Sequence, residues 1–484
     1  MSEGQSRRPA PGRGEGVQRW VAAADVATVA LALLALEILL FRGFRIEPGG
    51  VVLSATNAVR PFLGAVLIAL VRHAIVRRPS LRARLSHLVG RIRWPPAVSA
   101  IVWPFAVSRV AVLFVGITAV YAIGFQQAAP WRASEDEILN LLARFDAGWY
   151  WTIAENGYSI GGPGHSDVAF FPLYPMMMAG LGRMLGGHPL VAGFLISLGA
   201  FLGALAYVYQ LALLWCARAE NAGPAVVLLA FYPFALFFGL VYTESLFLLC
   251  AAGAIYHIVR GQTGWSAVLA FSAGLTRPNG FLLALPLAVL AVAGELRAGS
   301  PARRWLLGGR LSREAGGTGL ARGLVPALAS VAAMLAYSAY TYSHTGHPLA
   351  WAFAQGAWGR GYLGLLTLVT GPYASLQIEG LAGVLRRWPI ESFNALAGLF
   401  AIAGLWPVAR RYGLGLAAFV AVNLLPPMLF GGTVALGRYT SVLFPLFFWL
   451  ADVVPPERRQ YWIAAFGMGQ GLAACLFFTW RPLF

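Results

Sequence analysis

Long apolar stretches recur along the chain from Trp20 to the C-terminus, separated by short polar segments. A helix of about 20 apolar residues crosses a hydrocarbon core roughly 30 Å thick. The pattern therefore predicts an all-α polytopic membrane protein with about 13 transmembrane helices. The expected spans are residues 20–41, 49–71, 96–123, 189–214, 224–240, 244–257, 265–275, a segment that ends at Glu295, 325–342, 392–408, 414–430, 440–451 and 462–478.

Two longer polar segments, residues 124–188 and 343–391, are expected to be exterior loops. In the first, Ser134 and Glu137 have the spacing of a helix-capping box, and apolar residues follow at steps of three and four. This predicts a helix that lies on the membrane surface with its apolar face down. Residues 171–185 are apolar but short and contain two prolines, which predicts a second surface or re-entrant helix.

The arginines fix the expected orientation of the spans. The chain has a formal net charge of +17, all 36 basic residues are arginines, and many of them fall in two clusters, between residues 72 and 93 and between residues 297 and 322. Cytoplasmic loops of membrane proteins collect basic residues. Both clusters are therefore expected on the cytoplasmic side, which makes the basic charge a feature of topology rather than a nucleic-acid-binding face.

The overall composition excludes a soluble domain. Hydrophobic residues make up 58% of the chain and charged residues 11%, whereas soluble domains carry about a quarter charged residues. The three cysteines form no CxxC pair and have no histidine at ligand spacing, so neither a disulfide framework nor a metal site is predicted.

Four ionisable residues lie at the ends of expected spans on the exterior side: Asp146, Glu244, Arg277 and Arg438. The forked guanidinium of an arginine binds phosphate in a bidentate manner, and a carboxylate can accept the proton of an attacking hydroxyl. The set predicts a site for an anionic, phosphate-bearing substrate. The alternatives are an ordinary loop acid for Asp146, a structural ion pair of Glu244 with Arg277, and an interfacial anchor for Arg438.

Six strings of the sequence resemble, in order, the PIG-V-type mannosyltransferases, the family of the second GPI mannosyltransferase and its bacterial relatives. The strings are RFDAGWYWTIAENGY (144–158), AFFPLYP (169–175), FYPFALFFGLVYTESLF (231–247), GLTRPNG (274–280), HTGHPLAWAFAQGAWGR (344–360) and GRYTSVLFPLF (437–447). Residues 1–95, an N-terminal hairpin and a basic cytoplasmic loop, lie outside the resemblance, and residues 96–484 form the expected catalytic transmembrane domain.

The resemblance implies a glycosyltransferase of the GT-C fold that inverts the anomeric carbon and uses a polyprenyl-phosphate mannose as donor. It places the catalytic carboxylate, the general base for the acceptor hydroxyl, at Asp146. Substrate-binding residues are placed at Glu244, Arg277, Arg438 and Tyr439. Tyr150 and Gln355 lie in the same strings and are further substrate-binding candidates. The chain departs from the family in having Phe145 where a tryptophan often precedes the acid, and His347 where an aspartate is usual, so catalysis is not assigned to His347.

The expected location is the bacterial plasma membrane, with the site on the exterior face. The acceptor is left open among a glycolipid, a glycan and a protein, and no cofactor, metal or nucleic acid is predicted, although use of a divalent metal also stays open. The alternatives are a transporter or lipid flippase, and a GT-C enzyme with another donor sugar. A transporter would carry polar groups at mid-membrane, whereas this sequence gathers them at one face.

Overall fold

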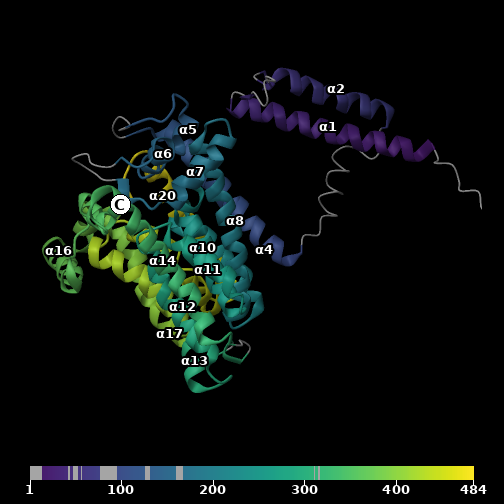
Figure 1. Cartoon of the computed structure of the whole chain (residues 1–484). Coiled ribbons are helices and arrows are strands. Elements are labelled where there is room, and N and C mark those ends of the chain that lie inside the picture. Colours follow the sequence, from purple (N-terminus) through teal and green to yellow (C-terminus); the bar gives the residue numbers. More distant parts are fainter. Residues whose placement is uncertain are drawn as a thin grey trace, which may run out of the picture. The chain divides into compact units, whose positions relative to one another are not determined.

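The computed structural model describes residues 13–41, 44–46, 53–55, 57–76, 95–125, 131–159, 167–309, 311–313 and 317–483. The chain divides into two compact units, Met1–Pro95 and Pro96–Phe484. Both are built almost entirely of helices (Figure 1).

The first unit is a helical hairpin. Helix α1 (Arg13–Phe41) packs against α2 (Val59–Ile75), and two short antiparallel strands, β1 (Phe44–Ile46) and β2 (Leu53–Ala55), lie between them. The expected second span began at residue 49, but residues 53–55 pair as a strand, so the helix starts ten residues later than expected, at Val59. Inside the hairpin, Nε of Arg72 donates to Oδ1 of Asp25 at 2.8 Å. This pair neutralises two charges that would be costly in a membrane.

The second unit contains the remaining elements. Its first part comprises α4 (Pro96–Thr118), η2 (Ala119–Ile123), α5 (Glu137–Leu141), α6 (Ala147–Asn156), η3 (Asp167–Ala169), α7 (Leu173–Met184) and α8 (Pro189–Trp215). The middle comprises η4 (Ala219–Asn221), α9 (Ala222–Phe231), η5 (Pro233–Gly239), α10 (Glu244–Val259), α11 (Thr263–Gly274), η6 (Gly280–Leu283), α12 (Ala284–Glu295), α13 (Pro301–Leu307), η7 (Leu311–Arg313) and α14 (Leu320–Thr345). The last part comprises α15 (Ala350–Phe353), η8 (Ala354–Trp358), α16 (Gly364–Arg387), α17 (Pro389–Gly431), α18 (Leu436–Ser441), α19 (Phe444–Val453) and α20 (Pro456–Phe478).

The long apolar helices indicate that the protein is an integral membrane protein. In the described part of the chain, α4 with η2, α8, α14, α17 and α20 are long and apolar enough to cross a membrane, and α9 with η5 makes a sixth span if the bent pair counts as one. The expected count of about 13 is not confirmed. Several expected spans form helices shorter than a bilayer crossing, such as α10 and α12, and the expected spans 392–408 and 414–430 lie on either side of a kink at Gly413 within α17.

Both expected exterior loops contain helices. In the first, α5 begins after Asp136, whose side chain accepts from the backbone of Ile138, so the predicted capping box at Ser134 is wrong. Ser134 instead accepts from the backbone N–H of Asp136 and lies two residues before the N-cap. In the second loop, residues 350–358 and α16 are helical. Apolar stretches too short to cross a membrane can still form the backbone hydrogen bonds of a helix.

The bend between α9 and η5, at 82°, leaves carbonyl groups that no helix satisfies. Arg109 of α4 donates from Nη1 to the carbonyl of Ala235 at 2.8 Å, and Gln470 of α20 donates to the carbonyls of Ala230 and Tyr232 at 3.0 and 3.1 Å. Backbone outside a helix is tolerated at membrane depth where such groups pair within the protein. These contacts hold the segment that leads to α10.

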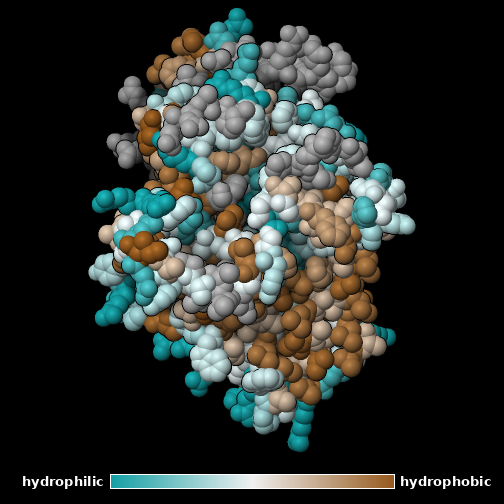
Figure 2. Space-filling view, turned by 90° about the vertical axis from the view of Figure 1, so that its left-hand side faces the viewer, coloured by the Kyte–Doolittle hydropathy of each residue, from teal (hydrophilic) through white to brown (hydrophobic). Residues whose placement is uncertain are grey.

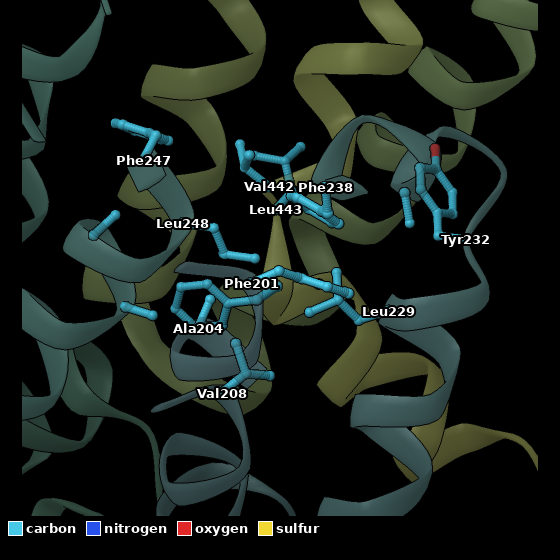
Figure 3. Close-up of a cluster of buried hydrophobic side chains, with 14 of the residues drawn as sticks. Phe201, Ala204, Val208, Leu229, Tyr232, Phe238, Phe247, Leu248, Val442 and Leu443 are labelled. Atoms are coloured by element: carbon cyan, nitrogen blue, oxygen red, sulfur yellow. The ribbon is translucent and has the colours of Figure 1, made fainter. Parts of the chain in front are cut away.

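A dense apolar core packs beside this bend (Figure 3). Phe201 of α8 stacks on Phe238 of η5 with ring centroids 4.6 Å apart, and Val442 and Leu443 come from the loop before α19. On the outside, Figure 2 shows a broad area of hydrophobic residues in the lower right of one face, as is typical of side chains that contact lipid. Within the second unit, α5 and α6 lie at the upper end of Figure 1 and α13 at the lower end.

Candidate active site

Asp146 sits at a strained turn at the start of α6. The preceding residue, Phe145, has a φ of 51°, which is uncommon for a residue with a side chain. Its ring packs against Phe477 and Trp480 of the C-terminal segment, at centroid distances of 5.3 and 5.0 Å. The aromatic residue that departs from the family pattern therefore fixes the turn. The side chain of Asp146 does not cap α6, which leaves it for other partners.

A buried tyrosine holds the backbone of this turn. The hydroxyl of Tyr242 donates to the carbonyl of Arg144 at 3.2 Å and accepts from the N–H of Asp146 at 3.2 Å. Tyr242 lies two residues before Glu244, the first residue of α10. The bent segment that ends at α10 and the loop that carries Asp146 are therefore attached to each other by one side chain.

Two arginines and two carboxylates form a continuous chain of ion pairs. Nη1 of Arg438 lies 2.5 Å from Oδ2 of Asp146, and its Nε lies 2.5 Å from Oε1 of Glu244. Nη2 of Arg277 lies 3.0 Å from the same oxygen of Glu244. Glu244 is fully buried and the two arginines are almost so. Paired charges are the form in which buried ionisable groups are tolerated.

Tyr439 lies between two guanidinium groups. The Cζ atoms of Arg277 and Arg360 lie 5.0 and 5.3 Å from the centre of its ring, and Nη1 of Arg360 donates to its hydroxyl. Burial opposes the phenolate, but the charges of Arg360, Arg277 and Arg438 lower the pKa of Tyr439 below its ordinary value. The electrostatic field at this place therefore favours a negative charge.

A cavity of about 310 Å³ opens beside the ion-pair chain. Six of the seven residues assigned from the sequence line it, namely Asp146, Tyr150, Arg277, Gln355, Arg438 and Tyr439. The seventh, Glu244, is not among the lining residues and lies behind Arg277 and Arg438. The structure thus brings all seven together, from the start of α6, from α10, η8 and α18, and from the loop after α11. Their chemical roles stay predictions.

Tyr150 and Gln355 contribute to the wall in different ways. The hydroxyl of Tyr150 lies 3.5 Å from Oγ1 of Thr243, and its ring packs edge-on against Phe170 at 5.2 Å. Nε2 of Gln355 donates to the carbonyl of Ala169 at 3.4 Å. Both residues therefore tie the loop around Phe170 to the cavity.

The sequence reasoning missed Arg360, although it ends one of the six matching strings. A lone arginine in an aromatic exterior segment was the available signal. With Arg360, the cluster has three guanidiniums and two carboxylates, which gives a formal charge of +1. Among the described residues, Nη1 of Arg277 and Oε2 of Glu244 are buried and have no hydrogen-bond partner. An unpaired buried donor beside a positively charged cavity is what an anionic ligand would satisfy.

Two further polar residues, His347 and Asp167, lie outside the cavity wall. His347 is exposed and is not among the lining residues of the cavity. Asp167 is buried, and its Oδ2 accepts from the backbone N–H and the hydroxyl of Ser159, at 2.6 and 2.9 Å, which is a structural role. Among the described residues, no group of three or more His, Cys, Asp or Glu side chains is placed to hold a metal ion.

Comparison with known proteins gives two kinds of match. Among solved structures, the chain is similar to the oligosaccharyltransferase of Archaeoglobus fulgidus in a crystal structure with Zn and sulfate, at 14% identity and a TM-score of 0.38, over 77% of this chain and 53% of that one. A structure of the same archaeal protein, AglB, with an inhibitory peptide and a dolichol-phosphate matches at 12% identity and a TM-score of 0.40, over 78% of this chain and 56% of that one. The chain thus spans about half the length of the solved structures that it matches.

No curated protein matches the sequence. A family model, Mannosyltransferase (PIG-V), matches residues 131–292. This region is about a third of the chain and carries Asp146, Tyr150, Glu244 and Arg277. Arg438, Tyr439 and Gln355 lie beyond its end. The match confirms the resemblance seen in the sequence strings: over residues 131–292 the protein is similar to the PIG-V mannosyltransferases, which supports a membrane glycosyltransferase.

Proposed function

We propose that the protein is an inverting glycosyltransferase of the GT-C fold. It takes a mannose-type sugar from a polyprenyl-phosphate donor and transfers it to an acceptor hydroxyl on the non-cytoplasmic face of a bacterial plasma membrane. The observation that carries this proposal is the chain of ion pairs from Asp146 through Arg438 and Glu244 to Arg277, of which Asp146 and the two arginines line one cavity.

The charge of the site supports a phosphodiester donor. The five ionised groups sum to +1, and a polyprenyl-phosphate sugar carries one negative charge at neutral pH, so the bound donor neutralises the cluster. The free Nη1 of Arg277 is the donor group available to a phosphate oxygen. When the sugar leaves, the phosphate gains a second negative charge, and fixed guanidiniums stabilise it best at that moment.

Asp146 is the proposed general base. The acceptor hydroxyl attacks the anomeric carbon from the side opposite the phosphate, the bond from that carbon to the phosphate oxygen breaks, and the electron pair stays on the phosphate. The acceptor proton passes to the carboxylate of Asp146, which lines the cavity. Arg438 orients this carboxylate and also holds Glu244, so the base and the phosphate-binding groups keep a fixed geometry.

The position of the arginine-rich helix supports an exterior site. Helix α13, which carries Arg303 and Arg304 of the second arginine cluster, lies at the opposite end of the unit from α5 and α6 (Figure 1). Basic segments are retained on the cytoplasmic side. A site next to α6 would then face away from the cytoplasm.

The test is transfer by the purified full-length protein in lipid nanodiscs. Polyprenyl-phosphate mannose, polyprenyl-phosphate glucose and a polyprenyl-phosphate pentose are compared with GDP-mannose as the water-soluble control, and glycolipid, glycan and protein fractions serve as acceptors. We expect a product only from a lipid-phosphate donor, with mannose preferred, and with an inverted anomeric centre by NMR. Movement of the labelled donor across liposomes without any product would support the flippase alternative and overturn the proposal. A parallel assay with EDTA tests the use of a divalent metal.

A further inference from the structure

Two further cavities follow the charged cavity, each sharing wall residues with the one before it. Val434 lines both the charged cavity and a second cavity of about 300 Å³. Pro389, Ile390 and Pro482 line both this second cavity and a third one of about 520 Å³. The three cavities therefore lie along a path that starts beside Arg438, passes the start of α17 and ends between α17 and α20.

The third cavity is an apolar groove between two candidate membrane spans, α17 and α20. Its walls carry Phe393 and Leu396 from α17, and Leu472 and Leu476 from α20. Leu396 is 61% exposed and Leu472 is 54% exposed, although both helices are apolar enough to cross a membrane. Exposed leucines on spanning helices face lipid. The groove therefore faces the hydrocarbon region, and the second cavity lies between it and the charged cavity.

We propose that this α17/α20 groove holds the isoprenoid chain of the lipid-phosphate donor, while its phosphate lies at Arg277 and Arg438. The inference rests on the proposed function and adds the place of the lipid. A ligand with one anionic group and one long apolar chain needs a polar pocket that is continuous with an apolar one. Transfer of the chain from the surrounding lipid to the groove loses no apolar contact, so the chain gains its place at little cost in free energy.

A hydrogen-bonded side chain links the path to the charged site. Asn394, which lines the second cavity, accepts from the N–H of Gly437 at 2.8 Å and donates to the carbonyl of Leu483 at 2.7 Å. Gly437 directly precedes Arg438. One amide side chain thus connects α17, the C-terminal segment and the residue before Arg438. A lipid chain in the groove therefore presents its phosphate at a fixed distance from Arg438.

A second groove competes for the same role. A cavity of about 660 Å³ lies between α6, α7 and α14 and has polar residues such as Glu155 and Arg183 in its wall. It shares no lining residue with the charged cavity or with the second cavity, whereas the α17/α20 groove borders the second cavity. Phe171 and Tyr337, with ring centroids 4.6 Å apart, lie between the two, and the hydroxyl of Tyr158 donates to the carbonyl of Phe170 at 2.7 Å. This barrier favours the α17/α20 groove.

The experiment measures how strongly the enzyme prefers a long lipid chain. Donors with the same sugar phosphate and either two or about eleven isoprene units are assayed in nanodiscs, and the ratio of their kcat/KM values is taken. We expect Leu396→Trp and Leu472→Trp, which fill the groove, to lower this ratio about tenfold relative to the unsubstituted protein. Met176→Trp, which places the same bulk in the competing groove, is the matched control and should keep the ratio.

Each outcome decides between distinct statements. The inference is overturned if Leu396→Trp and Leu472→Trp both elute like the unsubstituted protein, still transfer the sugar and show an unchanged ratio of kcat/KM values. A ratio lowered by Met176→Trp alone overturns it in favour of the competing groove. Absence of transfer from either donor by the unsubstituted protein would instead refute the proposed function, and the two failures are thereby separated.

Discussion

Arg438 and Asp146 are 292 positions apart in the chain, yet Nη1 of the arginine lies 2.5 Å from Oδ2 of the aspartate. The same guanidinium uses its Nε to bind Glu244. One planar side chain therefore sets the distance between the proposed base and the acid that holds Arg277.

Asp146→Asn is expected to lower kcat by about 10²- to 10⁴-fold, the usual contribution of a general base, because an amide cannot accept the acceptor proton. The measurement is initial rate with saturating donor, next to thermal unfolding in detergent. Glu220→Gln, which alters an exposed acid in η4, after the C-terminal end of α8, is the matched control and should keep full activity. Transfer by Asp146→Asn at the normal rate would remove the base role.

Arg438→Lys is expected to lower kcat/KM by about 10²-fold. A lysine keeps the charge, but a single ammonium cannot reproduce the fork that binds Asp146 and Glu244 with separate nitrogens. Arg410→Lys, an exposed arginine beside Trp406, serves as the control for the exchange itself. Equal activity of Arg438→Lys and the unsubstituted protein would show that charge alone suffices at this position.

Tyr439 should give the enzyme an alkaline limit. Its pKa is lowered by Arg360, Arg277 and Arg438 against the effect of burial, so its phenolate forms at a lower pH than the ordinary value of about 10. The new negative charge reduces the net charge of the cluster from +1 to zero and repels the donor phosphate. The KM for the donor should therefore rise as the pH approaches 10 from below, at nearly constant kcat.

The check is a profile of donor KM against pH for the unsubstituted protein and Tyr439→Phe. The phenylalanine keeps the ring between the two guanidiniums but has no proton to lose, so its KM should stay level over the same range. An identical alkaline rise in both proteins would assign the limit to another group.

Gly437→Ala should destabilise the protein by about 1–3 kcal/mol, the usual cost of overpacking. A Cβ at this position would collide with the ring of Phe234 and displace the start of α18, which carries Arg438. The measurement is the thermal unfolding midpoint together with kcat/KM. Combining it with Phe234→Leu removes the collision, and a double variant no more stable and no more active than Gly437→Ala would contradict this explanation.

The sequence by itself determined the class of protein and the residue types of the site. Apolar runs and the lack of charge are properties of composition, which the hydrocarbon core demands whatever the packing. Likewise, a charged residue at the end of an apolar run needs a partner or a ligand, so Asp146, Glu244, Arg277 and Arg438 stood out without any structure. These inferences use only local sequence.

The number and course of the helices were decided by tertiary contacts. The 82° bend before η5 exists because Arg109 and Gln470, from α4 and α20, satisfy carbonyls that a straight helix would pair internally. The kink at which the expected spans 392–408 and 414–430 meet lies at Gly413, whose φ is 86° and which leaves no room for a Cβ beside the backbone of Leu306 and Gly308. No periodicity in a single segment records such a contact.

The geometry of the site was decided in the same way. The neighbouring sequence did not identify Arg360 as a site residue, because its place in the site depends on its contact with Tyr439, 79 positions away. Whether Glu244 lines the cavity or lies behind it was equally open, and only the fold placed it beneath two arginines. The sequence supplies charges that must be paired, but the free energy of each pair depends on distances that only the folded chain sets.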